Sequence, residues 1–209
     1  LVNADGAENL AEACAENNAQ FIHVSTDYVF DGENNLAYTE EDFTNPLGVY
    51  GASKLAGDEL ALEVNPCSVI LRTSWVYSEF GKNFVKTMLN LFATKEELSI
   101  VADQFGQPTN ANDLAEAIMK IIKSEKITPG IFNFSNLGRI SWFDFAEKIA
   151  ELSEAKIKLN AIETSQYPTP AKRPKNSVLD LDKISKTYAI QLKPWEESLE
   201  DCVQILQNN

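Results

Sequence analysis

The sequence is poor in the residues that build metal sites and disulfide frameworks. Among its 209 residues there is one histidine, His23, and there are three widely separated cysteines, Cys14, Cys67 and Cys202. Zinc sites and disulfide frameworks need several Cys or His side chains at short spacing, so we predict neither and assign no metal ligand. We therefore expect a reduced, soluble, cytoplasmic protein.

Basic residues and long apolar runs are scarce as well. The chain has 18 Lys+Arg against 31 Asp+Glu, which gives a formal net charge of −13 at pH 7. Such a chain offers no basic face to phosphates, so we predict no nucleic-acid partner. The apolar runs are too short to span a bilayer and no leader-like segment is recognisable, so we predict no membrane partner.

The first part of the chain alternates between helix and strand patterns. Apolar residues recur at helical spacing over 4–18, and a nearly continuous apolar run follows over 20–25. A second helix and a second strand are predicted over about 50–62 and over 68–73. Buried strands separated by helices predict an α/β fold with a doubly wound parallel sheet.

Beyond residue 80 the predicted elements are less regular, and we expect a smaller, mixed α/β subdomain there. Ser141 followed by Asp144 is typical of a helix N-terminus. The predicted helices cover 82–93, Thr109 or Asn112 to about 123, Ser141 to about 152, and 194–207; the strands cover 98–101, 130–134 and 156–162, and a Pro-rich loop covers 167–174.

Two residues of the second predicted helix form a pattern suited to acid–base chemistry. Tyr50 and Lys54 lie four residues apart, so their side chains share one face of the helix. An ammonium beside a phenol lowers the pKa of the phenol, which makes the phenol a usable proton donor near neutral pH. The bare spacing also arises by chance, with an exposed Tyr ahead of a solvated Lys.

The ends of the two predicted strands carry polar residues. Residues 25–27, Ser-Thr-Asp, follow the first strand at the edge where open α/β sheets bind ligands. Thr26 offers a hydroxyl that can hydrogen-bond a substrate carbonyl oxygen while Tyr50 protonates it. A simple turn cap is the alternative. Because Arg72–Trp75 ends the next strand, all three groups are expected at one sheet edge, which favours the functional interpretation.

Several segments extend these motifs, namely HVSTDYVFDG (23–32), YGASKLAGDE (50–59), LRTSWVY (71–77), NFVKTML (83–89) and DQFGQPTNANDLA (103–115). Together they resemble the dTDP-4-dehydrorhamnose reductases, a family of extended short-chain dehydrogenase/reductases. The resemblance implies a Rossmann-like sheet and a smaller substrate-binding subdomain. It also implies reduction of the 4-keto group of dTDP-4-dehydro-6-deoxy-mannose to dTDP-rhamnose, with NADPH or NADH as cofactor and a dTDP-sugar as partner.

The resemblance also implies a role for each motif residue. Tyr50 matches the proton donor, Lys54 the residue that tunes it and binds the nicotinamide ribose, and Thr26 the partner of the substrate oxygen. Tyr28 follows Thr26-Asp27 where dehydratases of the superfamily have Glu, so reduction is favoured over elimination of water. The substrate-binding positions implied by the family are Thr26, Asp27, Tyr28 and Trp75.

One part of the family pattern is missing from the sequence. No GxxGxxG turn occurs, although that turn cradles the cofactor pyrophosphate in the family. We therefore expect about 80 residues of the family layout, at about 30 residues per unit, to precede Leu1. Residues 1–80 would be the rest of the dinucleotide-binding domain with its catalytic residues, and 81–209 mainly the substrate-binding subdomain. A chain lacking that turn is expected to be inactive by itself.

A second function remains open from the sequence. The regulatory subunit of methionine adenosyltransferase resembles these reductases, so a non-catalytic binding protein on the same scaffold is the alternative. The joint presence of Thr26, Tyr50, Lys54 and Trp75 favours the enzyme. The choice between NADH and NADPH and the oligomeric state are open, and an uncovered sheet edge would favour a homo-oligomer. His23, in an apolar strand, is interpreted as a buried or strand-end residue rather than a catalyst.

Overall fold

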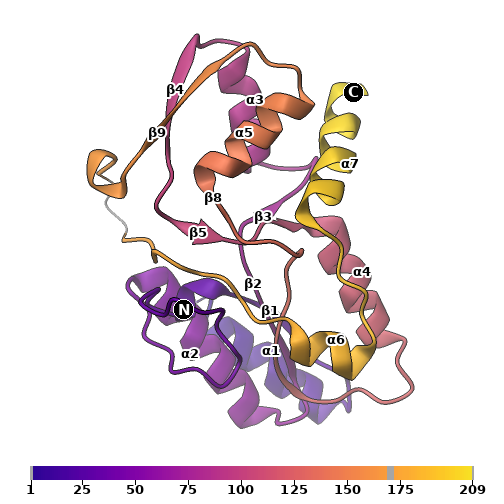
Figure 1. Ribbon diagram of the computed structural model, residues 1–209. Helices are drawn as coiled ribbons and strands as arrows, with labels where there is room; N and C mark the ends of the chain where they lie inside the picture. Colours follow the sequence, from indigo (N-terminus) through magenta and orange to yellow (C-terminus); the bar gives the residue numbers. More distant parts are fainter. Residues whose placement is uncertain (1, 169–171, 209) are drawn as a thin grey trace.

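A three-stranded parallel sheet organises the lower part of the molecule in Figure 1. The computed structural model describes residues 2–168 and 172–208. The strand order is β1 (Ile22–Thr26), β2 (Val69–Thr73), β7 (Gly130–Asn133). All five residues of β2 are buried, because the strand has a neighbour on each side and helices over both faces.

The two faces of this sheet are covered by different helices. Ile70 of β2 packs with α1 (Asp5–Glu16) and α2 (Val49–Val64). Its neighbours in the strand point the opposite way and pack with α4 (Ala111–Ile122) and α6 (Asp182–Tyr188). This arrangement confirms the predicted α/β fold with a parallel sheet covered on both faces.

A second apolar core fills the upper part of the molecule in Figure 1. Phe145, Ile149 and Leu199 are fully buried at its centre. The core lies among three helices and a pair of parallel strands, which are α3 (Phe84–Phe92), α5 (Trp142–Leu152), α7 (Trp195–Asn208), β4 (Glu97–Val101) and β9 (Lys158–Ile162).

Short elements lie between these two parts. Parallel β3 (Val76–Tyr77) and β6 (Thr109–Asn110) form one ladder, and antiparallel β5 (Phe105–Gly106) and β8 (Ile140–Ser141) form another. Two 3₁₀ turns are present, η1 (Asp27–Val29) and η2 (Thr164–Gln166). β7 belongs to the main sheet and α4 packs against it, so residues beyond 80 contribute to both parts of the molecule. The predicted division of the chain at residue 80 stays a prediction.

Most of the longer predicted elements are present, and side-chain caps mark the N-termini of α3, α4 and α5. Ser141 Oγ accepts a hydrogen bond from the Asp144 amide at 3.1 Å, and Asp144 Oδ2 accepts one from the Ser141 amide at 2.8 Å. The predicted cap of α5 is therefore confirmed. The seven-residue α6 is not predicted from the sequence, because about two turns are too short to show a helical period. Within the predicted Pro-rich loop, residues 169–171 lie outside the described residues, as does Leu1.

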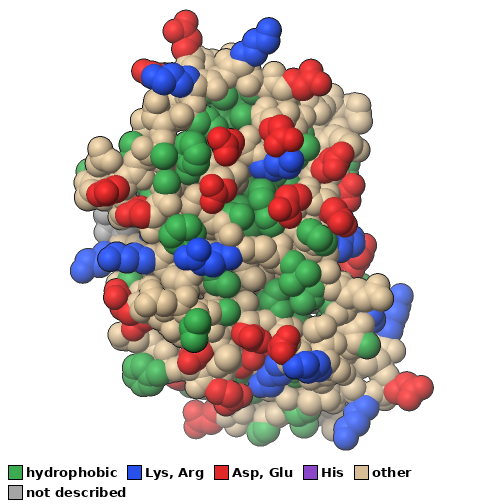
Figure 2. Space-filling model, in the orientation of Figure 1, with side chains coloured by type: hydrophobic (Ala, Val, Ile, Leu, Met, Phe, Trp, Pro, Cys, Tyr) green, Lys and Arg blue, Asp and Glu red, His purple; other side chains and the backbone are tan. Residues whose placement is uncertain are grey.

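The surface carries both signs of charge. On the face drawn in Figure 2, acidic and basic side chains are interspersed, with apolar side chains between them. Among the helices of the described residues, none is long and apolar enough to cross a membrane.

Candidate active site

The carboxyl ends of β1 and β2 lie side by side, with Thr26 opposite Thr73 in the register. The chain then turns into η1. There the Thr26 hydroxyl accepts a hydrogen bond from the Tyr28 amide at 3.2 Å and donates one to Asp27 Oδ1 at 3.0 Å. Thr26 and Asp27 are both buried. The hydroxyl predicted to meet a substrate oxygen is therefore held by the backbone and by a carboxyl group.

Tyr50 lies in the first turn of α2, next to Tyr28. The rings meet edge to face with centroids 5.9 Å apart, and about half of the Tyr50 side chain is exposed. Gly51 makes this approach possible, because a Cβ at that position would lie 2.1 Å from the Tyr28 carbonyl oxygen. The glycine thus lets the N-terminus of α2 contact η1 directly, which places the exposed phenol beside the end of β1.

Lys54, one helical turn further, reaches back to β1. Its Nζ donates a hydrogen bond to the Val24 carbonyl oxygen at 2.8 Å and lies 2.8 Å from His23 Nε2. Burial lowers the pKa of Lys54, and the nearby charge of Asp58 opposes that shift. The Lys54 ammonium therefore contacts β1. The action of this ammonium on the Tyr50 phenol stays a prediction.

A buried charged cluster lies behind Lys54. Asp58 Oδ2 accepts hydrogen bonds from Ser25 Oγ at 2.8 Å and from Arg72 Nε at 3.4 Å, and Asp58 Oδ1 lies 3.8 Å from His23 Nε2. Burial raises the pKa of Asp58 despite these partners. Within residues 2–168 and 172–208, Asp58 Oδ1 and Arg72 Nη1 have no hydrogen-bond partner. The cluster thus places a buried carboxylate one helical turn after Lys54 and pairs it with a buried guanidinium.

Asp27 is the second buried carboxyl group of the site. Burial raises its pKa to about 7, although hydrogen bonds from Ser177, Thr26 and the backbone oppose the shift. The pKa of Tyr28 is raised, first by burial and then by the charge of Asp27, while a hydrogen bond from Arg173 opposes the shift. Arg173 thus brings a cation from the C-terminal part of the chain to η1. Nothing in the sequence pattern predicted this contact.

Trp75 forms an aromatic pair with Trp142, here called the aromatic wall. Its backbone has φ +44°, a left-handed conformation that is costly for a bulky residue. Its indole stacks on Trp142 with centroids 3.5 Å apart and an interplanar angle of 11°. Gly106 accommodates the indole, since a Cβ there would lie 2.5 Å from it. Trp142 is therefore part of this aromatic wall together with Trp75.

A cavity of about 440 Å³ is lined in part by Trp142, which stacks on Trp75, and by Arg173, which contacts Tyr28. Most of its lining is apolar. Sequence reasoning missed this cavity because its lining comes from segments far apart in the chain. The lining residues are Phe84, Thr87, Met88, Leu91, Leu98, Ser99, Ile100, Val101, Gln104, Trp142, Tyr167 and Arg173.

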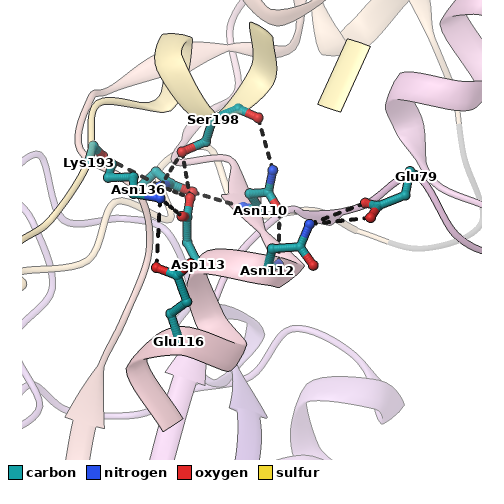
Figure 3. Close-up of polar contacts among 8 residues, drawn as sticks. All are labelled: Glu79, Asn110, Asn112, Asp113, Glu116, Asn136, Lys193 and Ser198. Carbon is teal, nitrogen blue, oxygen red and sulfur yellow. Dashed lines mark hydrogen bonds and ion pairs between the residues drawn. The ribbon is translucent and has the colours of Figure 1, made fainter. Parts of the chain in front are cut away.

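A second polar cluster joins α4 to α7 (Figure 3). Asp113 lies at its centre and accepts hydrogen bonds from Asn136 Nδ2 at 2.7 Å, from Lys193 Nζ at 2.8 Å and from the Ser198 hydroxyl. Asn110 Nδ2 donates to the Ser198 carbonyl oxygen at 2.9 Å. A neighbouring hollow of about 960 Å³ shares Asn110, Asn112, Asp113 and Lys193 with this cluster. Because the hydrogen bonds of the cluster join α4 to α7 and involve none of the predicted site residues, we treat it as structural.

Metal ligands are not assembled at either cluster. The part of the chain that the structure describes contains no group of three or more His, Cys, Asp or Glu side chains suited to holding a metal ion. The side chains described above bring a phenol, an ammonium, a hydroxyl and two buried carboxyl groups to the candidate site.

Comparison with known proteins gives a consistent result along the chain. A family model described as the RmlD substrate binding domain matches residues 1–208. The chain is 48% identical over 206 residues to a dTDP-4-dehydrorhamnose reductase of Sinorhizobium fredii, a match that covers 94% of this chain and 70% of that protein.

Two solved structures are similar over nearly the whole chain. A dTDP-4-dehydrorhamnose reductase of Clostridium acetobutylicum superposes with a TM-score of 0.93 at 41% identity, covering 98% of this chain and 72% of that one. A dTDP-4-dehydrorhamnose reductase of Bacillus anthracis, in complex with NADP, has a TM-score of 0.93 at 39% identity, covering 97% and 72%.

Proposed function

We infer the roles of the site residues from the fact that this chain belongs to the dTDP-4-dehydrorhamnose reductase family. Its reaction is the NAD(P)H-dependent reduction of the 4-keto group of dTDP-4-dehydro-6-deoxy-mannose to dTDP-rhamnose. The observation that carries the proposal is the placement of Thr26, Tyr50 and Lys54 at the ends of β1 and α2. The cavity that reaches the same edge through Arg173 supports a substrate of nucleotide-sugar size.

Lys54 and Tyr50 fit one part of a nicotinamide cofactor. An ammonium has three donors, and two of those of Lys54 are directed at Val24 and His23, which leaves one for a ribose hydroxyl. A bound nicotinamide cofactor supplies the hydride for the reduction. The sequence has no GxxGxxG turn for the pyrophosphate, so we assign these two residues to the nicotinamide ribose only.

Tyr50 and Thr26 are assigned to the reacting oxygen of the sugar. The exposed phenol of Tyr50 donates the proton that turns the reduced carbonyl into a hydroxyl. Thr26 has a single hydroxyl proton, which it donates to Asp27 Oδ1 while accepting from the Tyr28 amide. When Asp27 is protonated, its carboxyl can donate to Thr26 instead, and the Thr26 proton becomes available to the substrate oxygen.

The remaining predicted residues are assigned to substrate binding. Asp27 and Tyr28 line the sugar end of the site, and Trp75 supports the aromatic wall through Trp142. The apolar cavity suits a nucleotide base, and the Arg173 guanidinium at its edge suits a phosphate group. We infer that residues 1–80 carry most of the reaction chemistry and that residues 81–209 mainly bind substrate.

Replacing Tyr50 by Phe tests the proposed proton donor. Tyr50→Phe should lower kcat by about 10²–10⁴-fold, since it removes an acid–base group and little else. Because the chain spans about 70% of the length of its relatives, the assay uses the chain as it stands and also a fusion to the part of the Sinorhizobium fredii reductase that the match leaves uncovered.

A second tyrosine of the chain provides the control for this test. Tyr188→Phe changes a tyrosine of α6 whose hydroxyl donates to the Thr128 carbonyl oxygen at 2.6 Å, and it should retain kcat. The unfused chain should bind NADH and NADPH weakly in calorimetric titration. A Tyr50→Phe fusion with normal kcat would contradict the assignment of Tyr50, and a fusion without reductase activity would favour a binding protein.

A further inference from the structure

We propose that His23 is a positioning residue for Lys54: its neutral imidazole accepts a hydrogen bond from the Lys54 ammonium and fixes that ammonium at the end of β1. The inference rests on the proposed function for the meaning of Lys54 in cofactor binding. The contact itself is independent of that function.

The geometry at Lys54 determines which atom donates. Nζ lies 2.8 Å from His23 Nε2 and 2.8 Å from the Val24 carbonyl oxygen, so consecutive residues of β1 supply two acceptors to one ammonium. An ammonium has donors only, so Nε2 must be the unprotonated nitrogen of the ring. The neutral imidazole then carries its proton on Nδ1. This tautomer follows from the contact and can be measured.

The surroundings of His23 keep its ring neutral and oriented. Lys54 and Asp58 face it from α2, and Arg72, bound to Asp58, lies on the neighbouring strand β2. The Phe21 ring stacks on the imidazole with centroids 5.9 Å apart. Burial, and then the Lys54 charge, lower the pKa of His23 to about 4, so the ring is neutral at pH 7 and can accept a hydrogen bond.

Asp58 supports the same ammonium in a different way. Asp58 Oδ2 accepts hydrogen bonds from Ser25 and Arg72, and Asp58 acts on Lys54 as a nearby negative charge. Two tethers to β1 restrict an otherwise flexible four-carbon side chain. We infer that His23 sets the direction of the third N–H, the one assigned to the ribose.

The single histidine of the sequence allows a direct test in solution. Long-range ¹H–¹⁵N NMR spectra of the 209-residue chain should show His23 as the Nδ1–H tautomer at pH 7, with a titration midpoint well below that of a free histidine. Lys54→Met should remove the donor, shift the tautomer balance towards Nε2–H and raise the midpoint. Lys148→Met, which changes a surface lysine paired with Glu151 on α5, should leave both unchanged.

Kinetics of the active fusion then separate positioning from stability. His23→Phe should raise the KM for NADPH or NADH about 10-fold with little change in the KM for the sugar nucleotide. His23→Gln keeps an acceptor at this position and should recover most of the affinity, which a purely structural role would not predict.

Different outcomes would contradict the His23–Lys54 contact and the proposed function. An Nε2–H tautomer in the wild-type chain, or a His23 midpoint that Lys54→Met leaves unmoved, would overturn the proposal even if the reductase is active. An unchanged cofactor KM in a folded His23→Phe fusion would overturn it too. Absence of all reductase activity would count against the proposed function, while the NMR spectra would still decide the contact.

Discussion

Two buried aspartates on helices, Asp58 and Asp113, have pKa values that are shifted in opposite directions. Asp113 receives hydrogen bonds from Asn136, Lys193 and Ser198, and these outweigh the effect of burial and lower its pKa. At Asp58 burial dominates and the pKa is raised, although Arg72 and Ser25 are in contact. Asp58 is more deeply buried than Asp113 and has fewer hydrogen-bond donors, so burial sets the sign of the shift at Asp58 and the donors set it at Asp113.

The completeness of the two clusters differs in the same way. No buried side-chain oxygen or nitrogen of Asp113, Asn136 or Ser198 is unpaired, taking the described ranges of the chain. Around Asp58, one carboxylate oxygen and one guanidinium nitrogen lack partners. A complete network holds α4 to α7, whereas an incomplete one beside Lys54 leaves charge available to act on the ammonium.

The largest expected effect comes from removing the carboxylates themselves. Asp58→Leu should lower the free energy of unfolding by about 3–5 kcal/mol, because it leaves the buried Arg72 guanidinium without a counter-charge. Asp113→Leu should cost less, about 1–3 kcal/mol, because the Lys193 side chain is 44% exposed and can be solvated. Urea denaturation measures both, and a larger loss for Asp113→Leu would reverse the comparison.

Asp27 is a third buried carboxyl group, and its raised pKa predicts that the stability of the fold depends on pH. Its folded-state pKa of about 7 lies above the ordinary aspartate value of 3.8, so the folded state holds the proton more tightly than the unfolded state does. The wild type should therefore lose stability relative to Asp27→Asn as the pH rises from about 4 to about 7, by up to about 4 kcal/mol. Denaturation series at several pH values test this, and a pH-independent difference would contradict the raised pKa.

The smallest effect concerns the packing that brings the phenols together. Gly51→Ala should cost about 1–3 kcal/mol and lower kcat, because the added methyl would lie 2.1 Å from the Tyr28 carbonyl oxygen and push Tyr50 away from Tyr28. Gly48→Ala is the matched control, since no atom lies within 4 Å of its added methyl, and it should cost less than about 1 kcal/mol. Equal thermal melts for the two variants would show that the contact at Gly51 is loose.

Much of the fold could be predicted from the sequence. The apolar run of β2 and the apolar spacing of α1 are local patterns, and so is the cap at Ser141. The segments around Thr26 and Tyr50 indicated the family, which the comparisons show. The two-residue strands and α6 were missed because each is too short for its period to appear, so only its neighbours stabilise it.

The sequence by itself determined the α/β class, the order of the longer elements and the family. Apolar periodicity, helix caps and short motifs each depend on residues that are close together in the chain. Only the tertiary structure decided that Lys54 binds His23, that Arg173 contacts Tyr28 and that Trp75 stacks on Trp142. These contacts depend on strand register and on how α2 and α5 pack. Side chains far apart in the chain meet only when those long-range arrangements have formed.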